Sequence, residues 1–158
     1  LLERDGRRWF EVVTPDVLEE SPMFKGADPL LLNAVILALR PATAAPGEII
    51  LQRGDITTEM YFICRGEVEV LDVAGNVVNQ LKDGNFFGEV GLLLSTARTA
   101  DVRAKTLCDL FVLSKRDFSR ILLDHPQFAE SMLRVAKERY DLALSVAELL
   151  ASGPEASA

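Results

Sequence analysis

Between Thr43 and Ser114 the chain consists of short apolar runs separated by glycines, and this pattern constrains the fold more than any other feature. The runs are rich in Val, Ile, Leu and Phe, which favour strands, and the glycines between them favour turns. Many short antiparallel strands joined by tight turns are typical of a β-barrel or jelly roll. The predicted strands lie near 42–45, 48–52, 59–65, 67–73, 76–81, 98–104 and 107–114.

Helical signals flank this block on both sides. Asp28 and Ser114 are suitable N-caps, and Pro29 and Pro126 suit the first turn of a helix. The predicted helices cover about 29–39, 115–123 and 126–151, and Thr14 to Leu18 resembles the start of another short helix. The fold class is therefore α+β: an antiparallel jelly roll or barrel with an N-terminal helical segment, a short helix near 89–94 and two C-terminal helices.

Composition narrows the range of functions. With 158 residues, 49% of them hydrophobic, the chain can bury the core of one globular domain. A net charge of −7 argues against nucleic acid as a partner, because such proteins need a basic surface to neutralise phosphates. Arg4, Arg7 and Arg8 do not supply one, since Glu3 and Asp5 interrupt them.

The sequence offers no catalytic or metal-binding set. Cys64 and Cys108 lie in apolar runs without the CxxC spacing of metal and redox motifs, and His125 is the only histidine. We therefore expect two buried thiols, no metal and no enzymatic activity. There is no apolar run long enough to span a membrane. Because the chain opens on Leu1, we expect it to be a piece of a longer protein, so this absence says nothing about the parent protein.

The segment from Phe87 to Ala100 has the composition of a site for a cyclic phosphate. Gly88 and Gly91 allow close approach of the backbone, and the short helix predicted near 89–94 would present free N–H groups to an anion. Arg98 supplies a lasting positive charge with a planar fork for phosphate oxygens. The Glu89 carboxylate would repel a bare phosphate but accepts a hydrogen bond from a ribose hydroxyl, so the site favours a nucleotide.

The stretch FGEVGLLLSTARTA resembles the phosphate-binding cassette of cyclic-nucleotide-binding domains, and the resemblance extends from about Met23 to about Ala143. Other matching elements are Pro46-Gly47-Glu48, Gly54-Asp55, Met60-Tyr61-Phe62-Ile63, Gly66 and Asp83-Gly84. The ligand-binding residues that the resemblance implies are Phe87, Gly88, Glu89, Val90, Gly91, Arg98, Thr99, Ala100, Val70, Arg139 and Ala143.

Several of these residues bear on the base. By resemblance, the Thr99 hydroxyl reaches a guanine amino group, Arg139 contacts the base from the last helix, and Val70 lines the base pocket with Met60-Tyr61. At the helix position of Ala143, sensory channels selective for cyclic GMP carry an aspartate, so cyclic AMP is the favoured ligand and cyclic GMP stays open. The alternatives are that Arg98 pairs with a surface carboxylate and that Glu89 only favours the start of its helix.

The region before the predicted strands resembles the junction between linker and sensor in cyclic-nucleotide-gated and pacemaker-type channels, including bacterial relatives. It runs from Leu18 to Phe24 and on to Leu39. The resemblance implies a cytoplasmic sensor domain that gates a membrane channel or transporter, homotetrameric in the parent protein. The alternatives are the sensor of a cyclic-nucleotide-regulated transcription factor or kinase, and a ligand-silent homology domain.

The predicted division of the chain is into linker helices at 1–22, the nucleotide-binding domain at 23–143, and a helix extension with a disordered tail at 144–158. Beyond Leu142 the last helix is apolar on nearly all sides, which calls for cover on more than one face. The domain itself, a neighbouring subunit or a missing part of the parent can supply that cover. Simple fraying of the end is the alternative.

Overall fold

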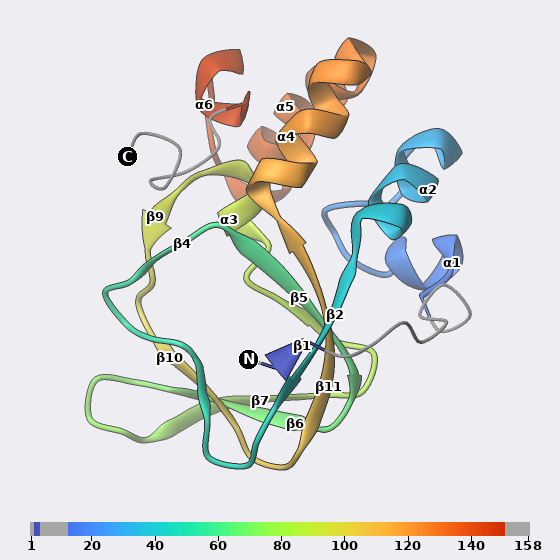
Figure 1. The fold of residues 1–158 in the computed structure, drawn as a ribbon. Coiled ribbons are helices and arrows are strands. Elements are labelled where there is room, and N and C mark those ends of the chain that lie inside the picture. Colours follow the sequence, from blue (N-terminus) through green and yellow to red (C-terminus); the bar gives the residue numbers. More distant parts are fainter. Residues whose placement is uncertain (1, 4–12, 151–158) are drawn as a thin grey trace.

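The computed structural model describes residues 2–3 and 13–150 (Figure 1). The strands are β1 (Leu2–Glu3), β2 (Arg40–Ala44), β3 (Ile49–Leu51), β4 (Ile56–Thr57), β5 (Glu59–Arg65), β6 (Glu67–Leu71), β7 (Val77–Lys82), β8 (Phe86–Phe87), β9 (Thr96–Ala97), β10 (Asp101–Ala104) and β11 (Cys108–Ser114). The helices are α1 (Pro15–Leu18), α2 (Pro29–Ala38), α3 (Val90–Leu93), α4 (Lys115–Asp124), α5 (Pro126–Tyr140) and α6 (Val146–Leu150).

The described strands form a β-roll of antiparallel sheets. One sheet has the order β1-β2-β11-β5-β8, a second has the order β3-β10-β6-β7, and β4 pairs with β9. The side chains between the two larger sheets form one apolar core, with Ile63, Val68 and Leu110 almost fully buried. The fold class predicted from the sequence is confirmed.

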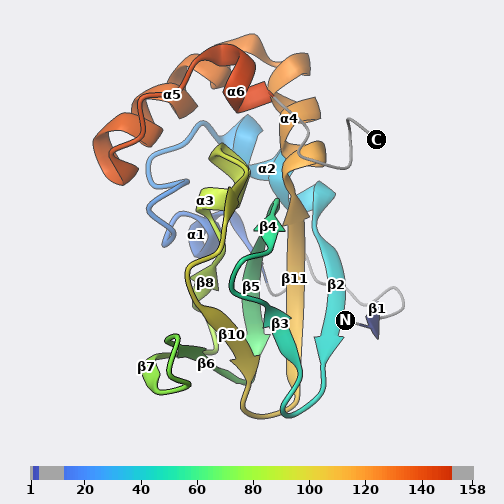
Figure 2. The ribbon, with the colours of Figure 1, turned by 90° about the vertical axis from the view of Figure 1, so that its left-hand side faces the viewer.

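The helices cover one end of this roll. In Figure 2, α4, α5 and α6 lie above the strands and the β6–β7 hairpin lies at the opposite end. A second apolar core fills the space between the helices and the strands, where Phe24 meets Phe118 of α4 edge to face at 5.9 Å. The short helix α3 lies between the strands and this helical layer, where it contacts β5, α4 and α6.

The capping signals operate as the sequence predicts. The Asp28 carboxylate accepts a hydrogen bond from the Leu30 N–H at 2.8 Å, and the Ser114 hydroxyl accepts one from the Asp117 N–H at 3.1 Å. Thr14 caps α1 by accepting from the Val17 N–H. Each side chain satisfies an N–H that has no partner inside its helix.

Two predicted elements are corrected. The strand expected at 98–104 begins only at Asp101, because Arg98 to Ala100 form a bend held by contacts with the 54–55 turn. The helix expected to reach Ala151 ends at Tyr140, where Asp141 adopts the left-handed conformation at φ 55° and ψ 39°. The N–H groups of Asp141 and Leu142 both donate to the Ala136 carbonyl, which closes the helix before the chain resumes as α6.

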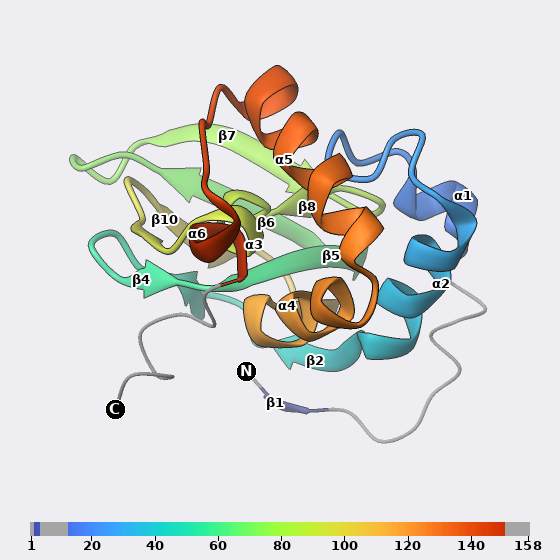
Figure 3. The ribbon, with the colours of Figure 1, turned by 90° about the horizontal axis from the view of Figure 1, so that it is seen from above.

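The segment after this break folds back onto the domain. Figure 3 shows α6 over α3 and beside α4. Leu149 is fully buried in the helical core, and Lys115, also fully buried, donates through Nζ to the carbonyls of Glu148 and Leu149. The domain itself therefore covers this face of the apolar stretch. No helix within the described ranges is long and apolar enough to cross a membrane.

Candidate functional site

The cassette begins where β8 leaves the sheet. Phe87 pairs with Tyr61 of β5, and their rings stack at 4.9 Å with planes 9° apart. The chain then turns at Gly88, whose φ of +79° favours glycine and where a Cβ would lie 2.7 Å from the Glu59 carbonyl oxygen. Glu89 precedes α3, and the helix anchors itself through the buried side chains of Leu92 and Leu93. Close packing against β5 thus fixes the position of Glu89.

Arg98 lies in the bend between β9 and β10. Its N–H donates to the Asp55 carbonyl at 2.8 Å, and its own carbonyl accepts from the Gly54 N–H at 2.8 Å. These two bonds tie the bend to the 54–55 turn, which the sequence marks only as a Gly-Asp pair. Because the backbone N–H and carbonyl of Arg98 are both hydrogen-bonded, this irregular segment can hold the Arg98 side chain in a defined position.

The Arg98 guanidinium is half-buried and unpaired. It forms no hydrogen bond or ion pair with any residue in the described part of the chain. Burial lowers the pKa of Arg98 from its ordinary value, and the nearby Tyr61 opposes that shift. A partly desolvated cation without a partner is costly, so this position is suited to receive an anion.

The Glu89 carboxylate already has two partners. The Tyr140 hydroxyl donates to Oε2 at 2.7 Å, and the Ser21 hydroxyl donates to the same oxygen at 3.3 Å. Tyr140 is the last residue of α5, and Ser21 follows α1. Three segments that are distant in sequence therefore meet at the residue assigned to the ribose.

The remaining predicted site residues lie in different surroundings. Val90 is half-buried and Gly91 is buried in α3, Thr99 is exposed and Ala100 half-buried in the bend, and Val70 is half-buried on β6. Arg139 is exposed and donates to the carbonyls of Pro22 and Lys25 at 2.5 and 3.0 Å. Ala143 is exposed in the break between α5 and α6.

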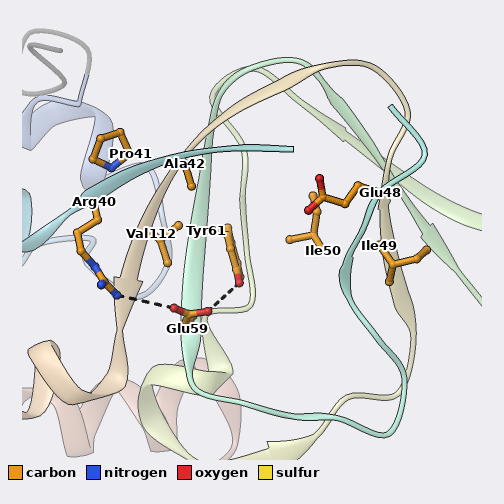
Figure 4. A pocket seen from close by; sticks show the side chains of 9 residues that line it. All are labelled: Arg40, Pro41, Ala42, Glu48, Ile49, Ile50, Glu59, Tyr61 and Val112. Carbon is orange, nitrogen blue, oxygen red and sulfur yellow. Dashed lines mark hydrogen bonds and ion pairs between the residues drawn. The ribbon is translucent and has the colours of Figure 1, made fainter. Parts of the chain in front are cut away.

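A cavity of about 450 Å³ is lined in part by Tyr61 (Figure 4). Its walls include Arg40 and Ala42 of β2 and Ile50 of β3. The Tyr61 hydroxyl donates to Glu59 at 2.9 Å, and Arg40 lies 3.9 Å from the same carboxylate. Tyr61 therefore both lines this cavity and stacks on the cassette residue Phe87.

The two cysteines and the histidine lie in packed surroundings. Of the two thiols expected to be buried, Cys108 is buried and Cys64 is only half-buried. Burial raises the pKa of Cys108 above its ordinary value. The His125 ring packs on Phe128 at 5.2 Å. Within residues 2–3 and 13–150 no three His, Cys, Asp or Glu side chains are grouped as metal ligands.

Sequence reasoning missed Tyr140 and Ser21 as partners of Glu89. The signal available was weak: one tyrosine in the middle of a helix predicted to reach Ala151, and one serine in a loop. Their contact with Glu89 joins residues 51 and 68 positions away, and no local pattern predicts that distance.

Comparison with known proteins identifies the family of this chain. The family model described as "Cyclic nucleotide-binding domain" matches residues 41–125, more than half of the chain. That range contains the whole strand block from Pro41, the cassette and Arg98.

Similar curated proteins are ion channels. The chain is 40% identical over 120 residues to potassium/sodium hyperpolarization-activated cyclic nucleotide-gated channel 4 of Homo sapiens, a match that covers 76% of this chain and 10% of that protein. Channel 2 of Mus musculus is also 40% identical over 120 residues, with 14% of its length covered. Channel 3 of Homo sapiens is 38% identical over 118 residues, with 15% covered. The chain thus spans a small fraction of these relatives.

A solved structure with the same fold comes from a different kind of protein. It is the N-terminal domain of a transcriptional regulator from Streptomyces coelicolor A3(2), with a TM-score of 0.70 and 25% sequence identity. The alignment covers 80% of this chain and 91% of that one. On the match of the family model, the fold and the cassette, this chain belongs to the cyclic nucleotide-binding domain family.

Proposed function

We propose that this domain binds a cyclic nucleotide, with cyclic AMP preferred over cyclic GMP, and passes the binding event to an attached effector. The observation that carries the proposal is the half-buried Arg98 guanidinium, which lacks a partner among the described residues. A singly charged cyclic phosphate would supply the missing anion and make two parallel hydrogen bonds to the planar fork. Membership of the family supports this assignment.

The remaining contacts are assigned by the chemistry of each residue. Gly88 and Gly91 let the backbone approach the phosphate, and Glu89 accepts the ribose hydroxyl. Phe87, Val90 and Ala100 shape the cassette, and Val70 and Thr99 face the base. Arg139 and Ala143, from the end of α5 and beyond, act on the base when the helical end closes over it.

The effector that we propose is a membrane channel or transporter, homotetrameric in the parent protein, with this domain on the cytoplasmic side. The similarity to three hyperpolarization-activated channels supports it. We propose the same division as the sequence indicates: linker helices to residue 22, the binding domain at 23–143 and an extension from 144. We further propose that the domain binds its ligand without hydrolysing it, since no catalytic set accompanies Arg98 among the described residues.

A second candidate effector is a transcription regulator. The structural similarity to the N-terminal domain of the Streptomyces regulator favours it. The net charge of −7 makes direct contact between this domain and nucleic acid unfavourable, so in either case we assign the domain a sensing role.

Calorimetric titration of the domain with cyclic AMP and cyclic GMP tests the proposal. We expect saturable one-to-one binding, with the lower dissociation constant for cyclic AMP. Linear 5′-AMP is the control, because it has the same base and ribose but a doubly charged, open phosphate. If neither cyclic nucleotide binds, or if 5′-AMP binds equally well, the assignment of the cassette to a cyclic phosphate is wrong.

A further inference from the structure

One oxygen of the Glu89 carboxylate accepts hydrogen bonds from two hydroxyl groups. The bond from Tyr140 is short at 2.7 Å, and the bond from Ser21 is longer at 3.3 Å. Ser21 is almost fully buried and also accepts from the Met23 N–H at 3.2 Å, so its hydroxyl is oriented toward Glu89. Burial, and then the Glu89 carboxylate, raise the pKa of Tyr140 above its ordinary value. Tyr140 is therefore a neutral donor at physiological pH.

The residues that precede and follow Tyr140 in the chain fix its position. On one side Arg139 donates to the carbonyls of Pro22 and Lys25, which fastens the end of α5 to the segment that follows α1. On the other side the left-handed Asp141 turns the chain back toward α6. Leu149 of α6 is buried in the helical core. The end of α5, the segment after α1 and α6 thus together fix the position of the phenol next to Glu89.

We propose that Tyr140 competes with the ribose hydroxyl of the nucleotide for the Glu89 carboxylate, and so sets the affinity of the site. The inference rests on the proposed function, because it needs a ribose at Glu89. A carboxylate that already accepts two hydrogen bonds is a weaker acceptor for a third, and turning it toward the ribose weakens the bond to Tyr140. Part of the ribose binding energy is then spent on releasing the end of α5.

The test uses Tyr140→Phe, which removes the hydroxyl and keeps the ring. We expect this variant to bind cyclic AMP about three- to tenfold more tightly than the native domain, the ratio that corresponds to one net hydrogen bond. The decisive probe is 2′-deoxy-cyclic AMP, which cannot donate to Glu89. For that ligand the native domain and Tyr140→Phe should have the same dissociation constant. Equal gains for both ligands, no gain, or weaker binding of cyclic AMP would each overturn the competition.

Ser21→Ala is a second variant that removes the other donor. Its gain should have the same sign and be smaller than that of Tyr140→Phe, because the Ser21 bond is longer; a loss of affinity in folded Ser21→Ala would count against the proposal. Circular dichroism and thermal unfolding verify that each variant is folded before titration. If Tyr140→Phe fails to fold, the ligand dependence of the Ser21→Ala gain decides the question in its place.

The titrations separate this proposal from the one on which it rests. If the native domain binds cyclic AMP and Tyr140→Phe binds it with the same affinity, competition is wrong and the nucleotide site stands. If neither the native domain nor either variant binds any nucleotide, the site itself is wrong, and the bond between Tyr140 and Glu89 is only structural. Binding by Tyr140→Phe where the native domain shows none supports both.

Discussion

Arg98→Ala should remove most of the phosphate affinity of this domain. Truncating one partner of a buried, hydrogen-bonded charge pair costs about 2–5 kcal/mol. Because Arg98 is half-buried and water screens part of its charge, we expect the lower part of that range, about 2–3 kcal/mol, or a dissociation constant about 30- to 150-fold higher. The loss should be nearly equal for cyclic AMP and cyclic GMP, since both present the same phosphate.

The same substitution should leave the ligand-free domain intact. The guanidinium has no partner within the described residues, and burial lowers its pKa, so the fold gains nothing from the charge. We therefore expect the midpoint of thermal unfolding of Arg98→Ala to equal that of the native domain or to exceed it. A strongly bound structural ion pair would give the opposite result.

Isothermal titration calorimetry with both nucleotides measures the first effect and differential scanning calorimetry the second. Arg103→Ala is the matched control: Arg103 is also an arginine of this region, but it pairs with Glu69 at 3.0 Å and is partly exposed. Its removal should change nucleotide affinity little. If Arg98→Ala binds as tightly as the native domain, or if Arg103→Ala loses as much affinity, Arg98 is not the phosphate ligand.

Three further predictions concern backbone and charge. Gly88→Ala should cost about 1–3 kcal/mol of stability and weaken nucleotide binding, because the left-handed φ is strained for alanine and the new Cβ meets a carbonyl of β5. Gly75 has a similar φ but open space around it, so Gly75→Ala should lose only about 1 kcal/mol and bind the nucleotide normally. Equal losses of stability for the two variants in denaturant titrations would contradict this prediction. Burial lowers the pKa of Lys115 to about 8, so above that pH the unfolded chain holds more protons, and the free energy of unfolding should rise by roughly 1 kcal/mol from pH 7.5 to 9. The raised pKa of Cys108 acts in the opposite direction at alkaline pH, because the folded chain keeps the thiol proton longer. In Lys115→Met the rise should be absent from the pH profile of unfolding. Asp141→Gly should stabilise the domain by roughly 0.5–1 kcal/mol in chemical denaturation, since glycine adopts φ 55° without strain. A lower denaturation midpoint than that of the native domain would show that the Asp141 side chain itself contributes to stability.

Features that depend on neighbouring residues could be predicted from the sequence. Glycines at turns, apolar runs of strand length and the caps at Asp28 and Ser114 act over a few positions, and the structure confirms the roll and the helices that they predict. The cassette was equally readable, because its glycines, Glu89 and Arg98 lie within one short segment.

Contacts between groups that are far apart in the chain are seen only in the folded structure. It places Arg98 in a bend tied to the 54–55 turn, ends α5 at Tyr140, and brings the Tyr140 hydroxyl to Glu89. It also buries Lys115 against the carbonyls of α6, although the sequence there reads as an ordinary first turn. The physical reason is that local patterns fix only short-range geometry. Which donor finds which acceptor depends on the summed packing of both cores, and no single stretch of sequence contains that information.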